Sequence, residues 1–173
     1  TEMEGHPDNV AAALYGGAVL AWSGEDFADA IKLEVSSRIT AVAFIPSNNV
    51  PTSKARKMLP ETIPHRDAVK NSINTALLTQ ALTNRPDLLL AATEDYLHQS
   101  YREAAMPKSY ALMQKLRAAG VAAFISGAGP TVLALLVDAD LNHELGDLVR
   151  AAGSGFEVEN LDISSVGYQV SNI

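Results

Sequence analysis

The sequence predicts an α+β fold, because strand and helix patterns occupy separate stretches of the chain. Residues 18–45 contain apolar runs typical of β-strands, whereas residues 65–83 repeat apolar side chains with the period of an α-helix. Further along, a glycine-rich loop at residues 126–131 separates two more apolar runs. The 173 residues suit one domain of ordinary size, which is long enough to bury a core.

The chain opens with a polar segment that leads into a short apolar helix. Pro7 suits the first helical position, and the pair Gly16 and Gly17 ends the helix. Because residues three apart share a helix face, we expect His6 and Asn9 to project together beside free backbone N–H groups. There they can hold a small polar molecule. The alternative is that both side chains only cap the helix.

Three strands are expected next. Residues 18–22 form a candidate buried strand, and residues 31–35 alternate apolar and charged side chains as a half-buried strand does. Residues 39–45 form a more apolar strand. Since the turn-forming residues 36–38 lie between the last two strands, we expect these two to pair as a hairpin.

A short helix is expected from Thr52 to residue 59, with Thr52 as its N-cap. Thr52 and Arg56 are four residues apart and therefore share one helix face, where a hydroxyl and a guanidinium can meet in a pocket. The alternative is a solvated basic helix, because Lys54 and Lys57 flank Arg56.

A long amphipathic helix is expected over residues 65–83, with a packing role. Its apolar positions are Val69, Ile73, Ala76, Leu77 and Ala81. A second helical stretch is expected over residues 86–97. The polar segment after it contains Arg102, for which the local sequence favours a surface ion pair with Glu103 or Glu94.

The last third of the chain contains the glycine-rich loop. A helix from Ser109 to Gly120 precedes a strand at residues 121–125, the loop, and a second strand at residues 132–137. The loop could cradle a phosphate, but no helix follows it, and by itself it indicates a β-hairpin. A helix at residues 142–152 and one or two strands within residues 156–170 complete the chain.

Composition excludes several classes of protein. There is no cysteine, so disulfides and thiolate metal sites are absent, which is compatible with a cytoplasmic protein. The net charge of −7, with scattered Lys and Arg, argues against nucleic-acid binding. No apolar run reaches the length of a membrane span, and no secretory signal is found. We therefore expect a soluble protein with neither nucleic acid nor membrane as partner.

Four segments, taken together and in order, resemble the homoserine kinase family of the GHMP kinase superfamily. They are the Gly5-His6-Pro7-Asp8-Asn9 box, the Thr52 to Pro60 helix, His98-Gln99-x-Tyr101-Arg102, and Ser126-Gly127-Ala128-Gly129-Pro130-Thr131. The resemblance covers essentially the whole chain. It implies a ferredoxin-like α/β sandwich typical of the GHMP kinase C-terminal domain at residues 18–173, preceded by one trailing helix of the N-terminal kinase domain at residues 1–17.

The resemblance also implies the activity. Homoserine kinases transfer a phosphoryl group from ATP to the hydroxyl of L-homoserine, giving O-phospho-L-homoserine in threonine biosynthesis. The residues implied to bind substrate are His6, Asn9, Thr52, Arg56 and Arg102, and the two arginines would clamp the carboxylate. His6 has a positioning role at most, and no general base is evident.

The glycine loop is implied to shape the active site next to the ATP phosphates. Its expected site residues are Ser126, Gly127, Gly129 and Thr131.

The superfamily's first two motifs, including the loop that wraps the ATP phosphates, do not occur in this sequence. We expect the ligands of ATP and Mg²⁺, and the residues that hold the homoserine amino group, in an N-terminal half that is not part of it. No metal ligand is assigned in this segment. We therefore expect a C-terminal, substrate-binding part that is inactive without that half, which becomes its partner. A homodimer is compatible with the resemblance.

Two alternatives remain at this point. A ferredoxin-like regulatory module that binds an amino acid would have a similar composition and architecture, and its arginines would bind an effector. Another small-molecule kinase of the superfamily would share the glycine loop. The His-Pro-Asp-Asn helix argues against the first alternative, and the two arginine segments argue against the second.

Overall fold

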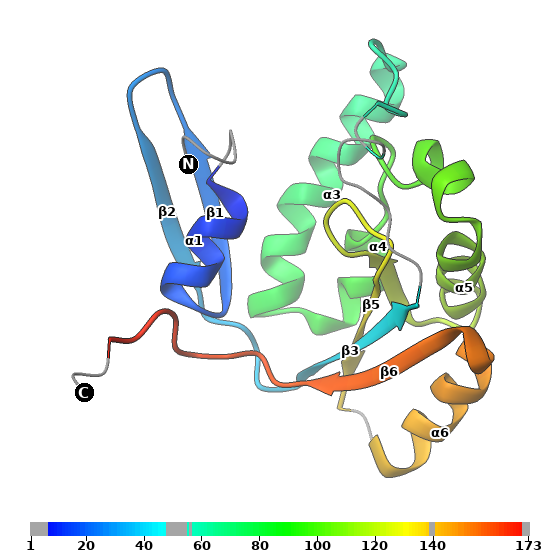
Figure 1. The fold of residues 1–173 in the computed structure, drawn as a ribbon. Helices are drawn as coiled ribbons and strands as arrows, with labels where there is room; N and C mark the ends of the chain where they lie inside the picture. The colour runs from blue at the N-terminus through cyan, green and yellow to red at the C-terminus, as the bar shows by residue number, and fades with distance from the viewer. Residues whose placement is uncertain (1–6, 48–54, 56, 139–140, 171–173) are drawn as a thin grey trace.

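A four-stranded antiparallel sheet forms the centre of the molecule. The computed structural model describes residues 7–47, 55, 57–138 and 141–170. The sheet contains β3 (Ile39–Pro46), β4 (Ala122–Ile125), β5 (Val132–Val137) and β6 (Phe156–Leu161), in the order β4-β5-β3-β6. With helices between β3 and β4 and between β5 and β6, this is the β-α-β-β-α-β arrangement of a ferredoxin-like fold (Figure 1). The expected fold class is confirmed.

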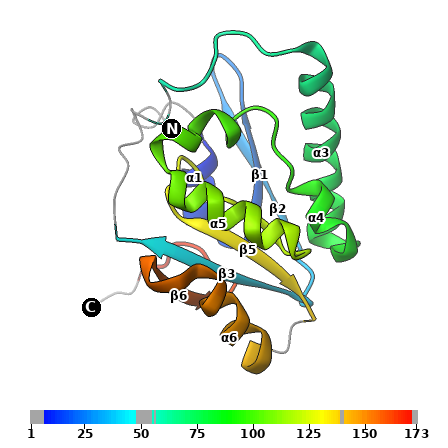
Figure 2. The same cartoon turned by 90° about the vertical axis from the view of Figure 1, so that its right-hand side faces the viewer.

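Alternate side chains of each strand point to opposite sides, so both faces of the sheet carry apolar residues. Both faces are covered by helices. On one face, Val42 and Phe44 of β3 pack with residues of α5 (Pro107–Ala118) and α6 (Leu141–Ala152). Figure 2 shows α5 lying across the sheet in front of β5. Residue 41 of β3 packs on the other face, which explains why the predicted strand is apolar throughout.

The second face is covered by α3 (His65–Thr83), the 3-10 turn η1 (Pro86–Leu88) and α4 (Leu89–Ala92). The long predicted helix is confirmed, but its packing role is only partly right. Val69 and Ile73 are 44% and 60% exposed, whereas Ala81 near the end of α3 is fully buried. The reason is that only the C-terminal half of α3 reaches the sheet, as Figure 1 shows.

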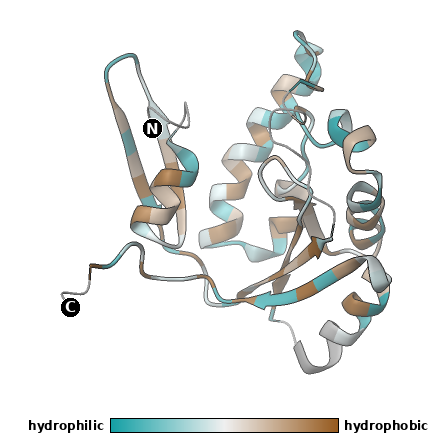
Figure 3. Cartoon of the chain, in the orientation of Figure 1, coloured by the Kyte–Doolittle hydropathy of each residue, from teal (hydrophilic) through white to brown (hydrophobic). Residues whose placement is uncertain are grey.

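A second, smaller unit lies beside the sandwich. It contains α1 (Asp8–Tyr15) and a hairpin of β1 (Ala18–Ser23) with β2 (Ala28–Leu33). Figure 3 shows apolar, brown positions on α1 as well as in the central sheet. The C-terminal segment packs against α1, where the N–H of Tyr168 donates to the carbonyl of Ala13 at 3.0 Å.

Glycine is required where this segment meets α1. A Cβ on Gly16 would lie 2.5 Å from the backbone of Val166, and the φ of Gly16 is +69°. The helix therefore ends at this glycine, as its position in the sequence predicts.

Several local expectations are wrong. The strand at residues 31–35 does not pair with β3, because β2 pairs with β1 and β3 lies between β5 and β6. The strand at residues 18–22 is not buried, since its hairpin stands outside the sandwich. The helical stretch after Pro86 ends at Ala92 and not at residue 97. By contrast, the expectation of one or two strands within residues 156–170 is confirmed, since the described residues there contain one strand, β6. No helix in the described part of the chain is both long and apolar enough to cross a membrane.

Candidate functional site

A polar cavity of about 890 Å³ lies between α1, α3, the segment that follows α4, and the loop between β4 and β5. Four residues singled out from the sequence line it, namely Asn9, Arg102, Gly127 and Gly129. These residues come from three parts of the chain far apart in sequence. His6, Thr52 and Arg56 lie outside the described residues. Leu59, the last residue of the helix predicted from Thr52, lines the same cavity.

A second groove, of about 730 Å³, lies between α1 and the C-terminal segment. Its lining is mainly apolar and backbone, and the only carboxylate among the described residues that line it is that of Asp162. The polar cavity is the better candidate because charged and amide side chains converge on it.

Arg102 is the one Arg or Lys among the described residues that line the cavity. It lies in the 3-10 helix η2 (Ser100–Ala105), is only 8% exposed, and donates from Nη1 to the carbonyl oxygen of Gly127 at 2.9 Å. The surface ion pair favoured by the local sequence is therefore wrong. Glu94, one of the partners considered, instead lies 3.8 Å from Arg117.

The glycine loop is a tight hairpin connection, as the sequence predicts. The Ser126 N–H donates to the carbonyl of Thr131 at 2.9 Å, and the Gly129 N–H donates to the carbonyl of Ser126 at 2.9 Å. Gly129 has a φ of +85°, and a Cβ there would lie 2.5 Å from the sulfur of Met106. Only glycine fits this position. Neither Ser126 nor Thr131 belongs to the cavity lining.

Asn9 lies in the first turn of α1, at the rim of the cavity. The helix begins at Asp8, with Pro7 in the N-cap position and its carbonyl accepting from the N–H of Ala11 at 2.8 Å. The side chain of Asn9 is exposed, so it is accessible to a bound molecule.

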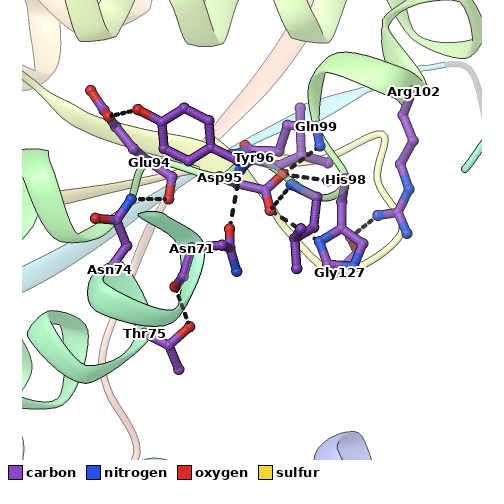
Figure 4. A network of polar contacts seen from close by, with 12 residues as sticks. Asn71, Asn74, Thr75, Glu94, Asp95, Tyr96, His98, Gln99, Arg102 and Gly127 are labelled. Atoms are coloured by element: carbon purple, nitrogen blue, oxygen red, sulfur yellow. Dashed lines mark hydrogen bonds and ion pairs between the residues drawn. The ribbon is translucent and has the colours of Figure 1, made fainter. Parts of the chain in front are cut away.

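Asp95 organises the wall that carries Arg102, and sequence reasoning missed it. Its carboxylate accepts from the N–H groups of His98 at 2.8 Å and Gln99 at 2.5 Å, and from His98 Nδ1 at 3.0 Å (Figure 4). Burial raises the pKa of Asp95, but the hydrogen bonds from the His98 ring and from the backbone of Gln99, His98 and Leu97 outweigh burial and lower the pKa to about 2.

Two amides on α3 tie this helix to the same wall. Asn71 Oδ1 accepts from the N–H of Tyr96 at 3.1 Å, and Asn74 Nδ2 donates to the carbonyl of Glu94 at 2.9 Å (Figure 4). Both asparagines line the cavity. A signal was present in the sequence, because two amides three residues apart share one helix face.

The cavity can therefore bind a small molecule that carries an anionic group. The guanidinium of Arg102 is suited to a carboxylate, while Asp8, Glu94 and Asp95 add negative charge elsewhere on the lining. Such a lining suits a molecule with both charges. Among the described residues there is no group of three or more His, Cys, Asp or Glu side chains that could hold a metal ion.

Residues 74–155 match a family model described as the C-terminal part of GHMP kinases. The homoserine kinase of Streptomyces avermitilis is 50% identical over 170 residues, covering 98% of this chain and 54% of the relative. The homoserine kinase of Rhodococcus erythropolis is 47% identical over 178 residues, covering 99% of this chain and 55% of the relative. The chain thus spans about half the length of the curated relatives it matches.

Solved structures of related kinases also resemble this chain. The homoserine kinase crystal structure from Cytophaga hutchinsonii superimposes with a TM-score of 0.82 at 29% identity, over 93% of this chain and 53% of that one. Mevalonate-3-kinase from Thermoplasma acidophilum, with mevalonate bound, gives a TM-score of 0.53 at 16% identity over 86% of this chain and 51% of that one. This second similarity concerns the fold alone.

Proposed function

From the premise that this chain belongs to the GHMP kinase family, we propose that it forms the substrate-binding part of a homoserine kinase. The reaction is phosphoryl transfer from ATP to the hydroxyl of L-homoserine. The observation that carries the proposal is the cavity that brings together Asn9, Arg102 and Gly127.

The carboxylate of homoserine binds to Arg102 in this proposal. A guanidinium matches a carboxylate with two parallel N–H donors, and the buried position of Arg102 makes the ion pair strong because water is excluded. Arg56 is proposed as the second arginine, with Thr52 beside it. Two observations support this placement, since Ala55 is fully buried in the core cluster and Leu59 lines the cavity.

Asn9 and His6 are proposed to face the hydroxyl end of the substrate. Asn9 lies at the start of α1, where backbone N–H groups also attract negative charge. Phosphoryl transfer depends mainly on positioning and on stabilising charge, so it does not require a dedicated base. His6 therefore has a positioning role.

ATP with Mg²⁺ supplies the transferred phosphoryl group. The glycine loop, including Ser126, Gly127, Gly129 and Thr131, is proposed to shape the site next to the phosphates. Its open backbone fits this role because Gly127 is exposed and a Cβ on it would meet no atom within 4 Å. The ligands of ATP and Mg²⁺ are proposed to lie outside these 173 residues, since the phosphate-loop motif does not occur in them.

We also propose a division of the chain at residue 17. Residues 1–17 would be the trailing helix of an N-terminal kinase domain, and residues 18–173 the C-terminal domain. The proposed division follows the end of α1 at Tyr15, and it would assign the β1–β2 hairpin, which also lies outside the ferredoxin-like sandwich, to the C-terminal domain. The protein would act in threonine biosynthesis in the cytoplasm.

A hybrid enzyme tests the proposed function. The N-terminal part of the Streptomyces avermitilis relative, which this chain does not cover, is joined to residues 1–173. With ATP and Mg²⁺, this hybrid should convert L-homoserine to O-phospho-L-homoserine, measured by mass spectrometry, with mevalonate as the control acceptor.

The 173-residue chain alone is the matched control and should give no product above a blank without enzyme. A folded hybrid that phosphorylates mevalonate but not homoserine would refute the proposed substrate. Turnover by the chain alone would refute the assignment of the ATP site to another part.

A further inference from the structure

Two side chains from the segment that follows α4 bind the start of the glycine loop, where β4 ends. Gln99 Oε1 accepts a hydrogen bond from the N–H of Ile125 at 2.6 Å, and Arg102 Nη1 donates to the carbonyl of Gly127 at 2.9 Å. The two hydrogen bonds run side by side: Gln99 and Arg102 are three residues apart on one segment, and their partners Ile125 and Gly127 are two residues apart on the other.

The hydrogen bond to Gln99 satisfies a backbone N–H at the edge of the sheet. β4 is an edge strand, so every second N–H and C=O points away from β5 and needs another partner. At Ile125, the last residue of β4, the partner is the Gln99 side chain. Gln99 is only 9% exposed, so water is a poor substitute for this acceptor.

Gln99 is itself held in place. Its backbone N–H donates to Asp95 Oδ2, which also accepts from the N–H of His98. The anchor is rigid because Asp95 fixes three consecutive residues before the helix that carries Arg102. A side chain attached to such a turn can set the position of a loop.

We propose that Gln99 is a positioning residue, which sets the place of residues 127–129 relative to Arg102 and thereby the affinity for the substrate carboxylate. Gln99 lines the same cavity as Arg102 and the glycine loop, so a change in the position of the loop is felt within one site. The proposal rests on the proposed function for its kinetic consequence and on geometry alone for the position of the loop.

The test compares Gln99→Leu, which removes the acceptor, with Gln99→Glu, which keeps an oxygen at the same distance. In the hybrid enzyme, Gln99→Leu should raise the homoserine KM by about tenfold or more, with the KM for ATP unchanged, and Gln99→Glu should restore most of the affinity. Gln114→Leu, on the exposed side of α5, is the matched control. If Gln99→Leu does not fold, Gln99→Met replaces it.

Amide hydrogen exchange of the 173-residue chain gives a second readout that needs no activity. Gln99→Leu should speed exchange at Ile125 and Gly129, and Gln99→Glu should not. Unchanged exchange and an unchanged homoserine KM in a folded Gln99→Leu variant would overturn the proposal, and so would an equal rise in both KM values. If the folded hybrid enzyme does not phosphorylate homoserine but Gln99→Leu still speeds exchange in the 173-residue chain, the proposed function is refuted and the positioning role of Gln99 stands.

Discussion

In the proposed function, substrate recognition depends most on Arg102. Its guanidinium is buried at the junction of η2 and the glycine loop, and the carbonyl of Gly127 holds it there. A planar guanidinium on the lining of a cavity matches a carboxylate, so this cavity is suited to an anionic ligand.

Replacing Arg102 tests this role. In the hybrid enzyme, Arg102→Ala should raise the homoserine KM by about 30-fold or more, which corresponds to ~2 kcal/mol, because the carboxylate loses its partner. Arg102→Lys should recover little, since a point charge cannot replace the planar fork. Arg66→Ala, at an exposed position on α3, is the control. A normal homoserine KM in Arg102→Ala would remove Arg102 from the substrate site.

Asp95 predicts a pH dependence of stability. Its pKa is about 2 in the folded protein and 3.8 for an ordinary carboxyl, so the unfolded chain binds the proton more readily. The stabilisation is therefore complete above pH ~4 and is lost as the pH falls toward 2. It amounts to about 2 kcal/mol, since the side chain is only 18% exposed.

Asp95→Asn should lower the free energy of unfolding at pH 7 by about 2 kcal/mol and by about half as much at pH 3, which lies between the two pKa values. Urea denaturation at both pH values measures the difference. Asp26→Asn, in the exposed turn of the β1–β2 hairpin, serves as control. An equal loss at pH 7 and pH 3 would show that the carboxylate's charge is not what stabilises the turn.

At the scale of elements, Arg117 joins three of them. From α5 it donates to Thr93 Oγ1 at 2.9 Å, to the carbonyl of Ala123 in β4 at 3.0 Å, and to the carbonyl of Leu90 in α4 at 2.7 Å. The side chain is 14% exposed. Because β4 is an edge strand, Arg117 satisfies one of its outward groups as Gln99 satisfies another.

Arg117→Ala should therefore lower the free energy of unfolding by about 2–3 kcal/mol, because two carbonyls and the hydroxyl of Thr93 lose a charged donor. Thermal or urea unfolding of the 173-residue chain measures this. Arg85→Ala removes an exposed ion pair with Asp87 and should change stability by less than ~1 kcal/mol. Equal effects of the two substitutions would contradict the structural role of Arg117.

At the scale of the whole molecule, the cavity lies where two units meet. Asn9 comes from the small unit of α1 and the hairpin, whereas Arg102 and the glycine loop come from the sandwich. A two-stranded hairpin has little stability of its own, and here it is supported by α1 and by the C-terminal segment. The position of Asn9 relative to Arg102 therefore depends on the end of the chain packing against α1.

Sequence alone determined most features that depend on neighbouring residues. The bounds of α3 and β5, the stop of α1 at Gly16 and the glycine hairpin follow from periodicity and from backbone conformations that only glycine adopts readily. Four short motifs in order also sufficed to indicate the family, because each combines residue types with a required spacing.

Only the tertiary structure decided which strands pair and which polar side chains are buried. The hairpin expected between β2 and β3 is wrong because a two-residue period identifies a strand but not its partner, which is chosen by the surfaces that both strands bury. Likewise Arg102 has the sequence context of a surface residue, and Asp95 and Gln99 attracted no assignment. The roles of Arg102 and Gln99 arise from contacts with β4 and the glycine loop more than 20 residues away, which no local pattern contains. Asp95 acts within its own turn, and its importance follows from the residues that this turn carries.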